Sequence, residues 1–151
     1  RREFAALSVK LYEKLSGSTA TPSSTNPFTD TSDVEVLKAY NLGITDGVSI
    51  DKFDPDKILN REQAATMLTR VFKRTYVEGW SLKEDSKFKF NYTMPTKFSD
   101  DAKISDWAKP SVYFMVCLLY TSDAADDLLC VDLGGRRIIN KKTVNYISAA
   151  R

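Results

Sequence analysis

The chain has 151 residues, and its 22 basic and 20 acidic side chains nearly cancel, leaving a formal net charge of +2. This near-neutral balance does not indicate a basic surface for binding nucleic acid or an anionic membrane. Histidine is absent and the two cysteines, Cys117 and Cys130, lie near the C-terminus, so most of the chain excludes thiol and imidazole nucleophiles and the commonest zinc sites. No run reaches the roughly 18 apolar residues that span a bilayer.

Residues 1–17 and 61–76 predict two related amphipathic helices, because apolar residues recur in both at the helical spacing. Each segment begins with an arginine, Arg1 or Arg61. Gly17 is expected to take the left-handed position that ends the first helix. The apolar stripes are Phe4, Leu7, Ser8, Leu11 and Tyr12 in the first helix and Ala64, Met67, Leu68, Val71 and Phe72 in the second.

Between these helices, residues 18–27 are rich in Ser, Thr and Pro and are interpreted as a linker. A short helix follows, because Ser32 and Glu35 have the spacing of a capping box. Its end is expected at Gly43. The predicted buried stripe of this helix is Val36, Leu37 and Tyr40.

Residues 45–59 predict a long loop, with Phe53 as an apolar plug and Pro55-Asp56 as a turn. The aspartates of this loop do not have the spacing of a calcium-binding EF-hand, so they are interpreted as solvated turn residues. No metal site is predicted.

The segment 77–97 is interpreted as an insertion. Phe88 to Tyr92 alternates apolar and polar side chains, which predicts a half-buried strand in a short hairpin or in an extended arm packed on the helices. Trp80 is expected to be a packing anchor, with a sugar-stacking platform as the alternative. A further helix should begin near Ser105 to Trp107, with Pro110 tolerated in its first turn.

Phe28-x-Asp30 recurs as Phe98-x-Asp100, each followed by a helix pattern. The chain is therefore interpreted as an incomplete array: the last helix of one unit at 1–17, a complete unit at 28–76 and the start of a third at 98–116. A repeated unit without a catalytic cluster is typical of recognition through a shared surface.

Residues 117–151 are interpreted as a non-native tail. The stretch 117–142 resembles the translation of a transposase-based sequencing adapter and its primer, and a divergent third unit is the alternative. Its aspartates and the run Gly134 to Arg137 are therefore not interpreted as a metal site or a phosphate loop.

The order of elements in the complete unit resembles the S-layer homology domain family. The elements are Phe28-x-Asp30, a helix, Gly43-Ile44, Gly47, Phe53-x-Pro55 and the helix start Asn60-Arg61-Glu62-Gln63-Ala64-Ala65. The resemblance implies an all-α fold of helical units around a pseudo-threefold axis. It also implies an extracellular location at the bacterial cell wall and surface layer.

The residues also predict where a ligand would bind. Asn60 is a good N-cap with Gln63 at N3, which places Arg61 at N1; in the first copy Arg1 would take N1 and Glu3 would take N3. A cation at N1 opposes the helix dipole by roughly 0.3–1 kcal/mol. Its repetition suggests that an anion, such as a carboxylate, is bound there. The alternative is an arginine paired with an acidic neighbour across the interface between units.

The resemblance supplies the expected ligand, since arginines at this motif position contact a pyruvylated sugar of the secondary cell-wall polysaccharide, in grooves between units. The chain departs from the family's Thr-Arg-Ala-Glu motif at Asn60, Glu62 and Gln63. The implied function is non-covalent anchoring of an exported protein to the wall, with the polysaccharide and adjacent units of the same parent chain as partners.

No catalytic residue, cofactor, nucleic-acid partner or membrane span is predicted. Two other functions remain open at this stage. One is a structural helical repeat that makes protein–protein contacts in surface-layer assembly. The other is the anchor portion of a wall-associated hydrolase.

Overall fold

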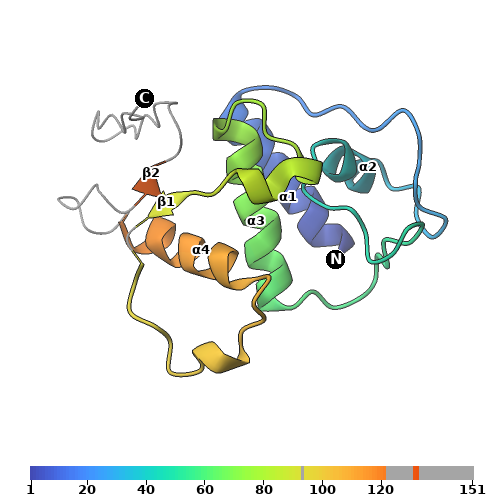
Figure 1. Ribbon diagram of the computed structural model, residues 1–151. Coiled ribbons are helices and arrows are strands. Elements are labelled where there is room, and N and C mark those ends of the chain that lie inside the picture. The colour runs from blue at the N-terminus through green and yellow to red at the C-terminus, as the bar shows by residue number, and fades with distance from the viewer. Residues whose placement is uncertain (93, 122–130, 133–151) are drawn as a thin grey trace.

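A computed structural model describes residues 1–92, 94–121 and 131–132. Over this part of the chain the fold is all-α, which confirms the predicted class (Figure 1). The α-helices are α1 (Arg2–Ser16), α2 (Val34–Asn41), α3 (Arg61–Tyr76) and α4 (Lys109–Thr121). Two short 3-10 segments, η1 (Leu82–Lys87) and η2 (Asp101–Lys103), lie between α3 and α4. The two-residue strands β1 (Asn91–Tyr92) and β2 (Val131–Asp132) pair antiparallel.

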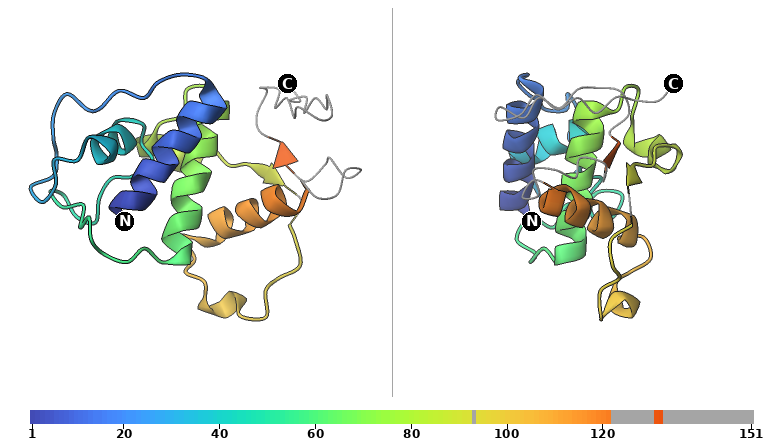
Figure 2. Two further views of the ribbon diagram at one scale, coloured as in Figure 1. Left: turned by 180° about the vertical axis from the view of Figure 1, so that it is seen from behind. Right: turned by 90° about the vertical axis from the view of Figure 1, so that its left-hand side faces the viewer.

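The helix α1 packs against both α2 and α3, and α4 packs against α3. In both views of Figure 2, α1 and α3 run side by side in the same direction, and α4 lies across α3. The N-termini of α1 and α3, where the two motif arginines lie, are therefore at the same end of the molecule. The predicted pseudo-threefold axis and the division into three units stay predictions.

Two apolar clusters fill the interior. The larger joins α1, α2, α3 and the long loop, and its fully buried members include Val9, Val36, Ile44, Phe53 and Val71. The second, around Phe114, lies between α3, α4 and the insertion. Leu7, one of the apolar positions of the first helix, has a side chain that is 55% exposed, because that turn of α1 borders a cleft rather than another helix.

The predicted helix ends are partly confirmed. Gly17 follows α1 with φ 69°, as expected for a left-handed cap. The capping box of α3 is present: the Asn60 side chain accepts from the amide of Gln63 at 2.8 Å, and Gln63 Oε1 accepts from the amide of Asn60 at 3.3 Å. Arg61 is accordingly the first helical residue.

The predicted start of the second helix is wrong by one residue. Asp33, not Ser32, caps α2, and its Oδ1 accepts from the amides of Glu35 at 2.8 Å and Val36 at 3.3 Å. Asp33 has an extended backbone, so the helix begins one residue later and Val36 takes N3. Glu35 cannot close a capping box from N2, and it instead accepts from Lys38 Nζ at 2.7 Å.

The helix α1 is assigned from Arg2, directly after Arg1. The predicted cap of this copy would precede Arg1, so the N1 and N3 positions of Arg1 and Glu3 stay predictions. The backbone nitrogen of Arg1 donates to the carbonyl of Lys57 at 3.0 Å, which holds this residue against the long loop.

The insertion packs on the helices as an extended arm, in agreement with the predicted alternative. Trp80 is 3% exposed and its Nε1 donates to Asp85 Oδ1 at 2.8 Å, so it is a packing anchor as expected. The strand predicted over Phe88 to Tyr92 is reduced to β1, while the ring of Phe90 stacks on Phe114 at 4.3 Å between centroids.

The last helix begins later than predicted. A turn closed by the hydrogen bond from the amide of Ala108 to the carbonyl of Ser105 precedes it, and α4 starts at Lys109 with Pro110 in its first turn. It continues through Cys117, which is buried, to Thr121. Residues 122–130 and 133–151 lie outside the described residues, so the adapter interpretation of the tail stays a prediction.

The long loop between α2 and α3 is shaped by the motif residues. Asp30 Oδ1 accepts from the amide of Phe53 at 3.0 Å, and Oδ2 accepts from the amide of Asp54 at 2.7 Å. The ring centroids of Phe28 and Phe53 lie 5.5 Å apart. Gly47 lies directly beside the ring of Phe28. Phe53 is completely buried, which confirms the predicted apolar plug.

Gly47→Ala should destabilise the protein more than Gly17→Ala. At Gly47 (φ 91°) an added Cβ would lie 2.6 Å from the carbonyl oxygen of Lys52 and 2.7 Å from Cε1 of Phe28, whereas at Gly17 (φ 69°) nothing lies within 4 Å. Gly17→Ala therefore measures the left-handed backbone cost alone, about 1–2 kcal/mol. Urea unfolding should show a clearly larger loss for Gly47→Ala, and equal losses would contradict the close packing of this loop.

The stabilising effect of Asp30 should depend on pH. The hydrogen bond from the amide of Phe53, with a further contribution from that of Asp54, lowers the pKa of Asp30 below its ordinary value. A carboxyl whose folded pKa is depressed stabilises the fold above its unfolded pKa, near about 4, and this contribution is lost as the pH falls through the folded pKa. Asp30→Asn should lower the melting temperature at pH 7, and the difference from wild type should shrink below about pH 4.

Asp51→Asn is the matched control, because the Asp51 side chain is exposed and makes no hydrogen bond or ion pair within the described residues. Its melting temperature should follow wild type at each pH. An Asp30→Asn difference that stayed constant from pH 7 to pH 3 would show that the carboxylate charge does not hold the loop.

Candidate functional site

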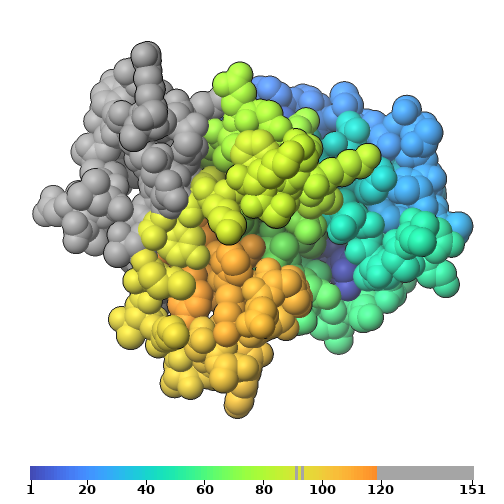
Figure 3. Space-filling view, in the orientation of Figure 1, coloured from blue at the N-terminus to red at the C-terminus, as the bar shows by residue number. Residues whose placement is uncertain are grey.

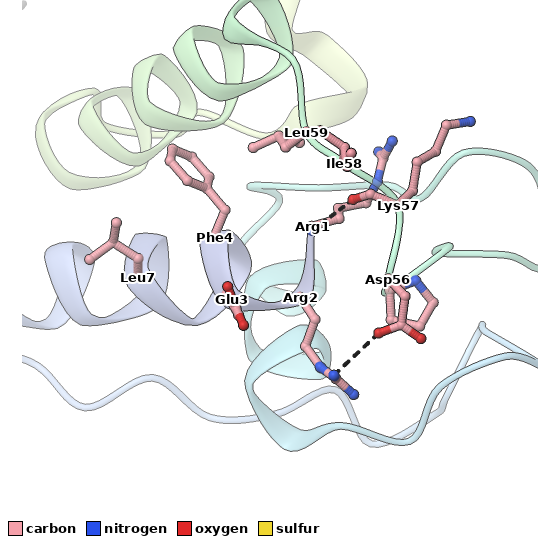
Figure 4. A pocket seen from close by; sticks show the side chains of 10 residues that line it. Arg1, Arg2, Glu3, Phe4, Leu7, Asp56, Lys57, Ile58 and Leu59 are labelled. Atoms are coloured by element: carbon pink, nitrogen blue, oxygen red, sulfur yellow. Dashed lines mark hydrogen bonds and ion pairs between the residues drawn. The ribbon is translucent and has the colours of Figure 1, made fainter.

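A cleft of about 490 Å³ lies at the head of α1. One wall is the first turns of α1, and the other is the end of the long loop just before α3 (Figure 4). The lining residues are Arg1, Arg2, Glu3, Phe4, Leu7, Pro55, Asp56, Lys57, Ile58 and Leu59.

Backbone hydrogen bonds hold the two walls together. The nitrogen of Arg1 donates to the carbonyl of Lys57 at 3.0 Å, and the amide of Arg2 donates to the carbonyl of Pro55 at 3.0 Å. These bonds satisfy nitrogens that have no intrahelical partner at the start of a helix. The cleft is therefore a fixed junction between α1 and the loop.

The two arginines at this junction have different surroundings, as Figure 4 shows. Arg2 extends toward Asp56 and forms an ion pair of 3.2 Å, with both side chains largely exposed. The Arg1 guanidinium is more enclosed: its Nε and Nη2 atoms are shielded from solvent and have no hydrogen-bond partner among the described residues. An enclosed cation with unpaired donors is costly, and a bound anion would satisfy it.

The predicted site residues fall into two groups. Arg1 and Glu3 line the cleft, and Glu3 is exposed there. Asn60, Arg61 and Gln63 lie at the head of α3, outside the cleft lining. Asn60 and Gln63 are engaged with each other in the capping box, which leaves Arg61 as the ligand-binding candidate of this group.

The side chain of Arg61 is exposed, and it forms no hydrogen bond or ion pair within residues 1–92 and 94–121. The predicted alternative, an arginine paired with an acidic neighbour across an interface between units, is therefore not found for Arg61 in the described part of the chain. Its guanidinium is available to a ligand at the positive end of α3.

Sequence reasoning missed three contributions to this end of the molecule. Lys57 and Arg2 also line the cleft, so its cations come from both walls. Glu62 connects the start of α3 to the segment that precedes α4. Its carboxylate accepts hydrogen bonds from the amide of Ser105 at 2.7 Å and from the Ser105 hydroxyl at 3.0 Å. The sequence offered one signal for the role of Lys57: it lies three residues before the Asn60 cap, and therefore close to a predicted helix start.

Neither metal ligands nor membrane spans are found in the described residues. They contain no group of three or more Cys, Asp or Glu side chains placed to hold a metal ion. None of their helices combines the length and apolar character that crossing a membrane requires.

Comparison with known families finds a similarity for one segment of the chain. Residues 27–65 match the model of the S-layer homology domain, from just before Phe28 to the first turn and a half of α3. This match supports the S-layer homology domain family for the segment, and domains of that family serve in anchoring at the cell wall and cell surface in general. Neither a curated protein nor a solved structure matches the chain.

Proposed function

We propose that this chain anchors an exported protein non-covalently to the bacterial cell wall by binding an acidic, pyruvylated secondary cell-wall polysaccharide. The S-layer homology domain at residues 27–65 supports the anchoring role. The acidic ligand is inferred from the two cationic helix heads. The parent protein is located at the cell surface, and the chain itself supplies binding rather than catalysis.

The observation that carries this proposal is the enclosed guanidinium of Arg1. Its two unpaired donors, Nε and Nη2, face no carboxylate of the chain within the described residues, although Glu3 and Asp56 line the same cleft. A ligand carboxylate can accept two parallel hydrogen bonds from a guanidinium. Lys57 on the opposite wall adds a positive charge that it shares with Asp54, whose Oδ2 lies 3.6 Å from its Nζ.

Arg61 provides the second contact in this proposal. It stands at the first position of α3, where unpaired amides and the helix dipole favour an anion. Because α1 and α3 point the same way, one extended polymer can reach both helix heads (Figure 2). A polysaccharide with an acidic group on each repeating unit fits this spacing of two cations better than a single small anion does.

Arg61→Ala should weaken sedimentation of the chain with purified wall sacculi by roughly 10-fold, the size of one charge-assisted hydrogen-bond pair. Helicity by circular dichroism should not change, because the Asn60 cap remains. Lys10→Ala is the matched control, since Lys10 is an exposed cation on α1 that lines no cleft at the helix head. Equal sedimentation of the Arg61 and Lys10 variants would remove Arg61 from the site.

Arg1→Ala should weaken wall binding more than Arg2→Ala does. Both guanidiniums line the cleft, but that of Arg2 already pairs with Asp56, whereas Nε and Nη2 of Arg1 have no partner in the described residues. The measurement is the fraction of protein retained by sacculi over a range of salt concentrations. A larger loss of wall binding for Arg2→Ala than for Arg1→Ala would place the ligand at the exposed Arg2–Asp56 ion pair instead.

Chemical removal of the secondary polysaccharide from the sacculi provides the test of ligand class. Retention should be lost on stripped walls and restored when the purified polysaccharide is coupled to a solid support. Undiminished retention on stripped walls would contradict glycan recognition and favour protein–protein contact within a surface layer.

A further inference from the structure

The peptide bond between Asp54 and Pro55 joins a strained residue to a proline in the long loop. Of the five prolines in the chain, only Pro55 follows an aspartate. Asp54 is also the one non-glycine residue with a positive φ, 59°, among the residues that the structure describes. The ring of a proline pushes the residue before it toward extended backbone angles with a negative φ, so Asp54 has an unfavourable geometry for its position.

Hydrogen bonds on both sides hold Asp54 in this conformation. Its amide donates to Asp30 Oδ2 at 2.7 Å, directly after the buried Phe53. On the other side, the carbonyl of Pro55 accepts from the amide of Arg2 at 3.0 Å. The loop therefore cannot relax at Asp54 without losing one of these contacts, and backbone strain held in this way is typical of functional positions.

The carbonyl group of the same peptide bond is polarised by a hydrogen bond. Its oxygen, which belongs to Asp54, accepts from the amide of Lys57 at 3.2 Å. A fixed N–H donor at a carbonyl oxygen stabilises the negative charge that develops there when a nucleophile attacks the carbonyl carbon. The strained bond is therefore also prepared for nucleophilic attack.

The nucleophile is the side chain of Asp54 itself. Its Oδ2 lies 3.6 Å from Lys57 Nζ, whereas its Oδ1 has no hydrogen bond or ion pair among the described residues. The side chain is 46% exposed, and in Figure 3 the turquoise residues of the long loop lie at the molecular surface, so water can reach this bond. A carboxylate is an established nucleophile at reactive centres. That of an aspartate can attack the carbonyl carbon of its own residue through a five-membered ring.

From this geometry we propose that the Asp54–Pro55 bond is a self-cleavage site of the chain, triggered by mild acid. Oδ1 of Asp54 attacks the carbonyl carbon of the same residue, and the C–N bond to Pro55 breaks. The electron pair of that bond stays on the proline nitrogen, which takes a proton from the solvent and leaves as a secondary amine. Water then opens the cyclic anhydride of Asp54, which restores the side-chain carboxylate and leaves a new C-terminal carboxylate. The sum is hydrolysis of one peptide bond, without any other reactant.

The charges around the bond set the pH at which cleavage should be fastest. The charged side chains around it are Arg2, Asp30, Lys52, Asp56 and Lys57. Among these, the carboxylate of Asp30 must stay charged to hold Asp54 in its strained conformation. The hydrogen bond from the amide of Phe53 keeps the pKa of Asp30 below its ordinary value. In mild acid Asp30 is therefore still ionised, while protons for the leaving nitrogen are more plentiful than at neutral pH.

Cleavage would separate the parts of the chain that support the helix-head cleft. The clamp between Asp30 and Phe53 stays on the upstream fragment. The carbonyls of Pro55 and Lys57, which hold the start of α1, lie on the downstream fragment. The break therefore loosens the cleft and would release the chain from the wall. This role in release rests on the proposed function, whereas the cleavage itself does not.

The 151-residue chain is incubated at about pH 5, folded or in concentrated urea, and its mass is followed by mass spectrometry under denaturing conditions. Two fragments should appear, the second beginning at Pro55, with masses that sum to the chain plus one water. The folded chain should be cut roughly 10-fold faster than the unfolded chain, because unfolding removes the strain. In ¹⁸O-labelled water, the label should enter both carboxylates of Asp54, since water can open the anhydride at either carbonyl. A contaminating protease would label the new C-terminal carboxylate alone.

Variants test the nucleophile and the strain separately. Asp54→Asn keeps a side chain that tolerates a positive φ but removes the attacking carboxylate, so cleavage should slow by at least roughly 10-fold. Asp30→Asn should lower the rate of the folded chain toward that of the unfolded chain and leave the rate in urea unchanged. The matched control is Asp51→Asn, an exposed position of the same loop that should be cut like wild type. Circular dichroism at the same pH establishes that each variant is folded.

The proposal is overturned if the folded chain is not cut between Asp54 and Pro55, if the unfolded chain is cut at least as fast, or if Asp54→Asn is cut like wild type. Sedimentation with sacculi is measured separately on uncut and fully cut chain. Retention should fall after cleavage, and unchanged retention would contradict the role in release. Failure of the uncut chain to sediment would contradict the proposed function and leave the cleavage result standing.

Discussion

The carboxylate of Asp30 accepts hydrogen bonds from two consecutive amides, Phe53 and Asp54, and this clamp fixes the course of the loop between α2 and α3. The side chain of Phe53, whose amide is part of this clamp, is completely buried. Two residues further on, the carbonyls of Pro55 and Lys57 receive the first nitrogens of α1. The helix-head cleft therefore exists because one exposed carboxylate organises a loop that has no regular secondary structure.

This arrangement explains why so much of the family motif is structural rather than ligand-binding. Asp30 and Phe53 shape the loop, while Gly47 leaves space that a side chain would take from the Phe28 ring. The loop residues of the motif fix where the cations lie, and Arg61, the motif residue at the start of α3, is one of those cations. Arg1 and Arg61 are then held at the same end of two parallel helices (Figure 2), where the carboxylate-bearing polymer of the proposed function would meet both.

Local sequence patterns predicted the helices, the Asn60 capping box and the buried Phe53, because each depends on neighbours a few residues away or on burial alone. Position 33 was missed, because adjacent Ser and Asp side chains both make good caps and the backbone angles decide between them. Contacts between distant segments could not be predicted from one sequence: the cleft joins residues 56 apart.

The most direct test of the central claim is an NMR titration of the ¹⁵N-labelled chain with a pyruvylated monosaccharide, followed on the Arg1 guanidinium and on the amides of Arg2 and Lys57. The account predicts saturable shifts at these groups, which salt weakens and which a matched sugar without the pyruvyl carboxylate does not cause. An Arg1 guanidinium that is already paired with a carboxylate of the protein, and whose resonances do not respond to the sugar, would contradict it.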